Sequence, residues 1–90
     1  MNGTHYLATA WIGERLLRFT AIPYQARLRI TFGGIGTQPE ALGSVIGLDT
    51  DAPGLRVSAP LHVEWATIHS ASIIAEAVSI WNEVRRDCDG

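Results

Sequence analysis

The sequence contains no lysine, a single cysteine and few charged side chains for its length. Charged residues make up 18% of the 90 residues, below the roughly one quarter that is typical of soluble domains. One cysteine, Cys88, cannot form an internal disulfide, so nothing argues for an oxidising compartment. The N-terminus lacks a signal-peptide pattern, and no stretch approaches the roughly 20 apolar residues of a membrane helix. We therefore expect a cytoplasmic protein.

What is present is enough for one small folded domain. Hydrophobic residues make up 47% of the chain, and a chain of this size buries about 60–65% of its unfolded surface. We expect a single α+β domain over residues 1–90. The low charged fraction leaves much uncharged surface, which is typical of a protein that meets another protein.

The charges are divided unevenly along the chain. Residues 1–36 hold four arginines and one glutamate, a net charge of +3, whereas residues 37–90 hold three arginines and eight acidic residues, a net charge of −5. All fixed side-chain positive charge is guanidinium, which suits bidentate and stacked contacts. The sequence therefore predicts a basic half and an acidic half that could orient a partner.

Hydrophobic alternation predicts three N-terminal strands, over residues 5–12, 15–22 and 26–32. Gly13-Glu14 fits a two-residue hairpin turn of type II′. A slip of one residue in pairing would move a whole strand to the other face. Pairing Ile22 with Arg27 gives one coherent apolar face, whose two alanines on the first strand leave a trough for a helix. That face comprises Tyr6, Ala8, Ala10, Leu17, Phe19, Ala21, Leu28, Ile30 and Phe32.

The opposite face of this predicted sheet mixes arginines with apolar side chains. It comprises His5, Leu7, Thr9, Trp11, Leu16, Arg18, Thr20, Ile22, Arg27, Arg29 and Thr31. The candidate partner-binding residues are Trp11, Arg18, Arg27 and Arg29. Tryptophan and arginine are enriched at the centres of protein interfaces, which favours a protein partner. Two alternatives stay open: binding of single-stranded nucleic acid through the same arginines, and coverage of this face by a second layer. A homodimer is also compatible with the sequence.

The C-terminal helix is the clearest element, from about Ser70 to Asp87. Its apolar stripe comprises Ser70, Ile73, Ile74, Ala77, Trp81 and Val84. In the middle of the chain, Thr37 and Glu40 have the spacing of a capping box, which predicts a short helix over residues 38–46. Residues 55–65 alternate as an edge strand interrupted at Pro60, and residues 55–68 stay open between strand and helix.

No catalytic, metal or cofactor motif is complete. Gly34 and Gly36 lack the third glycine of a dinucleotide loop, and the Asp49-to-Gly54 turn lacks the later ligands of a calcium loop. His62 and Glu64 would share one face of a strand, which leaves a small His/Glu-dependent enzyme as an alternative. We expect no cofactor, no metal and no catalytic residue.

The sequence thus favours a small non-enzymatic module that binds another macromolecule, most readily a protein. In size and composition it is like small accessory inhibitors of phage and mobile elements, such as anti-defence inhibitors, and like bacterial immunity proteins. An inhibitor or immunity-type protein is the function that we expect.

Overall fold

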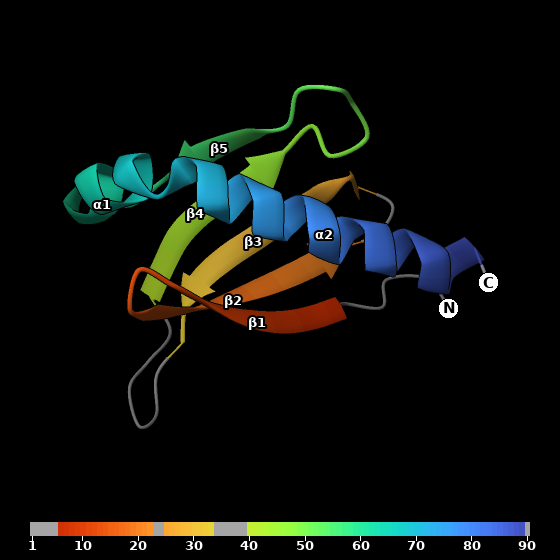
Figure 1. Ribbon diagram of the computed structural model, residues 1–90, viewed down its shortest axis with the longest axis horizontal. Helices are drawn as coiled ribbons and strands as arrows, with labels where there is room; N and C mark the ends of the chain where they lie inside the picture. The colour runs from red at the N-terminus through yellow and green to blue at the C-terminus, as the bar shows by residue number, and fades with distance from the viewer. Residues whose placement is uncertain (1–5, 23–24, 34–39, 90) are drawn as a thin grey trace.

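A five-stranded antiparallel sheet and a long C-terminal helix make up the protein, whose computed structural model describes residues 6–22, 25–33 and 40–89 (Figure 1). This is the α+β class that the sequence predicts. In chain order the elements are β1 (Tyr6–Ile12), β2 (Arg15–Ile22), β3 (Arg27–Phe32), β4 (Glu40–Ile46), β5 (Gly54–Val57), the 3-10 helix η2 (Pro60–His62), α1 (Val63–Ile68) and α2 (Ser70–Asp89).

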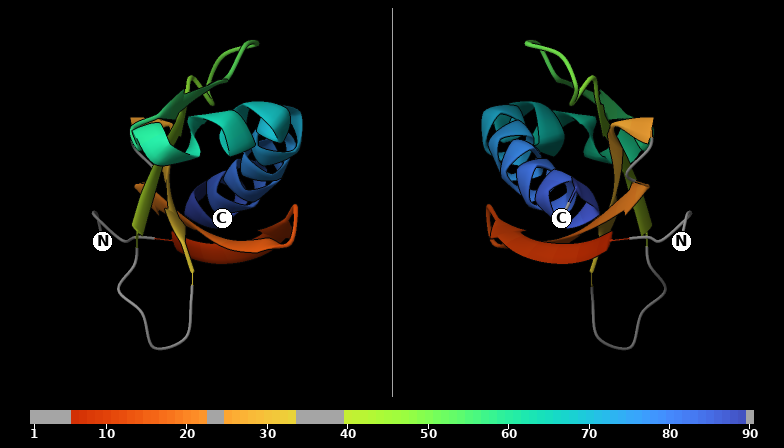
Figure 2. Two further views of the ribbon diagram at one scale, coloured as in Figure 1. Left: turned by 90° about the vertical axis from the view of Figure 1, so that its left-hand side faces the viewer. Right: turned by 90° about the vertical axis from the view of Figure 1, so that its right-hand side faces the viewer.

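The sheet is a meander in which each strand pairs with the next along the chain, in the order β1-β2-β3-β4-β5. Figure 2 shows that the sheet curves around α2, so the helix lies on its concave side. Helix α1 lies at one end of α2, on the same side of the sheet. The convex side carries no helix among the described residues, and we call it the open face.

The predicted register of the first three strands is confirmed. Ile22 pairs with Arg27 and Phe19 with Ile30, while Ala8 lies opposite Phe19 on β1. The apolar residues of β1, β2 and β3 therefore share the concave face, as the alternation requires. Gly13-Glu14 is the predicted two-residue turn, but φ is +53° at Gly13 and +65° at Glu14. Two positive φ angles make it a type I′ turn rather than type II′.

The helix predicted over residues 38–46 is wrong, because residues 40–46 form strand β4. The predicted capping residue Thr37 lies outside the described residues. Pairing of Thr31 with Ala41 and of Ile30 with Gly43 leaves Leu42 as an extra residue, a β-bulge. The bulge keeps Leu42 fully buried, and its carbonyl accepts the backbone N–H of Ser58 at 2.9 Å. β-Branched residues and pairing to both neighbours decide the conformation against a weak helical signal.

The edge strand predicted over residues 55–65 is correct only for its beginning. Strand β5 ends at Val57, and Pro60 begins η2, which leads directly into α1. Proline at the first position of a helix loses no backbone hydrogen bond, whereas in a strand it interrupts the ladder. The described chain is therefore helical from Pro60 onwards, apart from one turn residue, His69, which directly precedes α2.

The core lies between α2 and the concave face. Helix α2 packs against β1, β2 and β5, as its apolar stripe and the small Ala8 and Ala10 predict. The buried helix residues are Ile73, Ala77, Ile80, Trp81 and Val84. They meet Leu17, Phe19, Ala21, Leu28, Ile30, Leu42 and Val45 of the sheet. Within the described residues, no helix combines the length and the apolar character needed to cross a membrane.

Candidate functional site

The open face carries all four candidate partner-binding residues. Trp11 lies opposite Leu16, and Arg18 lies opposite Thr31, in the register of β1, β2 and β3. Arg27 and Arg29 are exposed, and Trp11 is 72% exposed. The structure therefore brings these residues to one face. The second layer that the sequence left open is not found among the described residues, since η2, α1 and α2 all lie on the concave side.

Strand β5 adds a fourth arginine, which is not among the residues that the sequence predicts for this face. Arg29 pairs with Ser44, and Ser44 pairs with Arg56, so Arg56 projects from the same face as Arg29. The alternation of residues 55–57 predicts that Arg56 points away from Leu55 and Val57. Its position on the open face depends on the register of β4, a segment for which the sequence predicts a helix.

The open face has a strong positive charge without compensation. Its described residues are Leu7, Thr9, Trp11, Leu16, Arg18, Thr20, Arg27, Arg29, Thr31, Ala41, Ser44, Ile46 and Arg56. None is acidic, and none of the four arginines makes a hydrogen bond or ion pair with another described residue. Residues two apart on a strand are about 7 Å apart, so Arg27 and Arg29 repel each other. An anionic group that approached this face would relieve that repulsion.

Apolar side chains lie at the β1 edge of this positive face. Leu7 is 62% exposed and Trp11 is 72% exposed, and both belong to the edge strand. A large exposed aromatic side chain beside arginines is the composition of a protein-interface centre. Trp11 is the one aromatic residue among the described residues of the open face. A stacking platform for single-stranded nucleic acid uses several aromatics in succession.

A second group of side chains gathers at the end of the sheet, on the concave side. The guanidinium carbon of Arg15 lies 5.3 Å from the ring centroid of Phe32 and 5.1 Å from that of Trp65. The ring of His62 packs edge-on against Phe32, with centroids 4.7 Å apart. These contacts join β2, β3, η2 and α1, and no sequence pattern points to Arg15 or Phe32 as part of a site.

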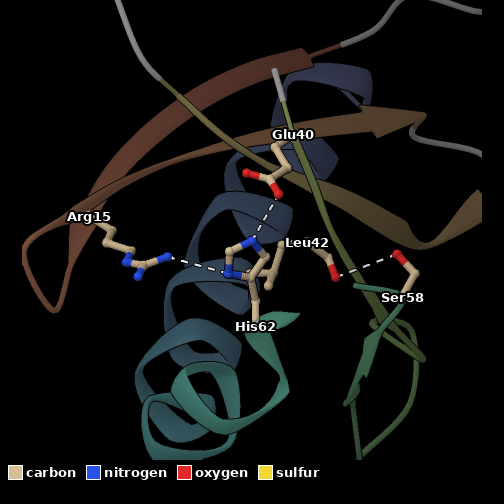
Figure 3. Close-up of polar contacts among 5 residues, drawn as sticks. All are labelled: Arg15, Glu40, Leu42, Ser58 and His62. Atoms are coloured by element: carbon tan, nitrogen blue, oxygen red, sulfur yellow. Dashed lines mark hydrogen bonds and ion pairs between the residues drawn. The ribbon is translucent and has the colours of Figure 1, made fainter. Parts of the chain in front are cut away.

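His62 is held between a cation and a carboxylate (Figure 3). Its Nε2 lies 3.0 Å from Glu40 Oε2, and its Nδ1 lies 3.5 Å from Arg15 Nη1. An arginine can only donate, so Nδ1 accepts and the Nε2–H donates to Glu40. Both ring nitrogens are thus engaged in holding η2 against the beginnings of β2 and β4.

The pairing of His62 with Glu64 on one face of a strand is wrong. His62 lies in η2 and Glu64 in α1, and the carboxylate on His62 belongs to Glu40, 22 residues earlier. His69 packs on Trp65, with ring centroids 4.8 Å apart. Within residues 6–22, 25–33 and 40–89, no three potential metal ligands are close enough together to hold an ion.

The chain matches no protein-family model, no curated protein and no solved structure, so its function is argued from its own geometry.

Replacing His62 with alanine is expected to lower the free energy of unfolding by about 1–2 kcal/mol. The change removes two hydrogen bonds to charged groups and the ring contact to Phe32. The Glu40 side chain is 60% exposed, so solvent weakens its contribution. Urea denaturation measures the loss. Glu64→Gln is the control, because this exposed residue of α1 should change stability by less than about 0.5 kcal/mol. Equal stability of both variants would contradict the structural role of His62.

Proposed function

We propose that this protein is a non-enzymatic module that binds an acidic partner protein through the open face of its sheet, as an inhibitor or assembly partner. The observation that carries the proposal is the group of four arginines, which lies on a face without acidic side chains among its described residues. We place this activity in the cytoplasm, in keeping with the single cysteine.

Physical chemistry supports an acidic protein as the partner. Arginines that are unpaired in the free protein break no internal ion pair when a partner binds. They gain bidentate contacts when carboxylates approach. Leu7 and Trp11 supply apolar area beside them, which a protein surface can cover and a phosphate backbone cannot. The arrangement suits an accessory inhibitor, because such a protein acts by covering a charged functional surface of its target.

Reversing two of the charges tests the proposal. The double variant Arg27→Glu and Arg29→Glu is expected to weaken partner binding by about 100-fold or more, since each central arginine contributes a hot-spot contact. It should keep its fold, because both side chains are exposed and point away from the core. The partner is captured from a lysate of the source cells, identified, purified and titrated against the purified variants by calorimetry.

A matched control changes the same charge elsewhere. Arg85 and Arg86 are exposed near the C-terminus of α2, so Arg85→Glu with Arg86→Glu should leave binding unchanged. Full binding by the Arg27/Arg29 variant would overturn the proposal. So would capture that nuclease treatment abolishes, with an affinity that falls with salt at a slope of about −0.7 per phosphate contacted, because that dependence marks single-stranded nucleic acid.

A further inference from the structure

A pocket of about 510 Å³ lies at the end of the sheet where the β1–β2 turn, the end of β3 and the beginning of β4 meet. Its lining residues are Trp11, Glu14, Arg15, Leu16, Phe32, Gly33 and Glu40. Its volume falls within the range of pockets that take small ligands or large side chains. Trp11, Leu16 and Phe32 give it a mainly apolar wall.

Of the three charged residues that line the pocket, Arg15 and Glu40 both contact His62, and Glu14 lies exposed in the β1–β2 turn. Arg15 stacks over Phe32 and points towards Nδ1 of His62, while Glu40 accepts from the opposite nitrogen of the same ring. The charges of Arg15 and Glu40 are thus linked through His62 and offset one another. A charged occupant would gain little from such a site and would lose its hydration, so the pocket favours an uncharged, apolar side chain.

The pocket is continuous with the open face. Trp11 and Leu16 line the pocket and are also cross-strand neighbours on that face. Arg18 follows Leu16 by two residues on the same strand and the same face, a separation of about 7 Å. The side chains of Leu16 and Arg18 both lie over Gly33, because a Cβ there would lie 3.0 Å from Leu16 Cδ2 and 3.5 Å from Arg18 Cγ.

We propose that the partner protein inserts one large apolar side chain into this pocket, and that a carboxylate about 7 Å from that anchor meets Arg18. The inference rests on the proposed function and specifies its partner: an acidic segment with an aromatic or large aliphatic residue beside its carboxylates. Neighbouring residues on one face of a helix or strand have about this separation, so a single secondary-structure element supplies both contacts.

Two synthetic peptides test the inference on the intact protein. The first carries one central phenylalanine flanked by glutamates, and the second is identical except that alanine replaces the phenylalanine. The first should bind at least about tenfold more tightly, because burial of a phenylalanine side chain is worth that factor. NMR titration should shift the indole N–H signal of Trp11, and should leave that of the buried Trp81 in place.

Variants of the protein assign the preference to the pocket. Trp11→Ala should reduce the difference between the two peptides to less than about twofold, and Trp11→Phe should retain it. Leu61→Ala is the control, because Leu61 is 90% exposed on η2 and does not line the pocket. Arg27→Glu with Arg29→Glu should weaken both peptides by a similar factor, since it removes charge and leaves the anchor site intact.

The outcomes separate the inference from the proposed function. Equal binding of both peptides, still dependent on Arg27 and Arg29, would overturn the anchor pocket and leave the acidic-partner proposal standing. A preference for phenylalanine that persists in Trp11→Ala would also overturn the pocket. If neither peptide binds at millimolar concentration, both proposals fail; binding of a thymidine 20-mer in that case would assign the face to nucleic acid.

Discussion

Replacing Gly43 with alanine is expected to destabilise the protein by about 3 kcal/mol or more, and to release β5 from the sheet. A Cβ atom at this position would lie 1.9 Å from the carbonyl oxygen of Arg56, and 2.9 Å from both Val57 Cα and the carbonyl carbon of Arg56. These are backbone atoms of the neighbouring strand, so no side-chain rotation relieves the contact. Strands β4 and β5 must therefore move apart. The free-energy cost of losing their pairing exceeds the usual cost of an added methyl group in a packed core. Urea denaturation and amide hydrogen exchange measure the two effects.

Gly54 provides a matched control on the same pair of strands. A Cβ atom added there meets nothing within 4 Å, and its backbone is compatible with alanine. Gly54→Ala is therefore expected to leave stability unchanged or to raise it by up to about 1 kcal/mol, because it restricts the unfolded chain. If Gly43→Ala were as stable as Gly54→Ala, with β5 amides still protected, the close approach of the two strands would be wrong.

The sequence predicts the first three strands and α2 because each has strong local periodicity. Strand β3 alternates without exception, and one register alone gives a coherent apolar partner face on β2. The stripe of α2 repeats over about four turns, and Ile73, Ala77, Trp81 and Val84 are buried as predicted. The arrangement of the open face follows from the same register, which is why Trp11, Arg18, Arg27 and Arg29 lie on one face.

The middle of the chain could not be predicted because its conformation depends on non-local contacts. The capping-box spacing near Glu40 favours a helix over residues 38–46, yet pairing with β3 and β5 gives a strand with a bulge at Leu42. Arg15 and His62 are 47 residues apart in the sequence, and Glu40 is 22 residues from His62. No local spacing links these three residues, so the polar cluster and the pocket beside it are visible only in three dimensions.

Replacing Trp81 with alanine is expected to cost about 3–5 kcal/mol, a large part of the total stability of a domain of this size. Trp81 is 4% exposed in the core between α2 and the sheet, so truncation leaves a large cavity, and a domain of this size has only about 5–15 kcal/mol of stability. Its buried Nε1 has no hydrogen-bond partner among the described residues.

Trp81→Phe removes that donor and keeps an aromatic ring, so it should cost less than about 1.5 kcal/mol. Trp11→Ala, at an exposed position, should change stability by less than about 0.5 kcal/mol. Thermal unfolding monitored by circular dichroism ranks the three variants, and an unchanged melting temperature for Trp81→Ala would disprove the packing of α2 described above.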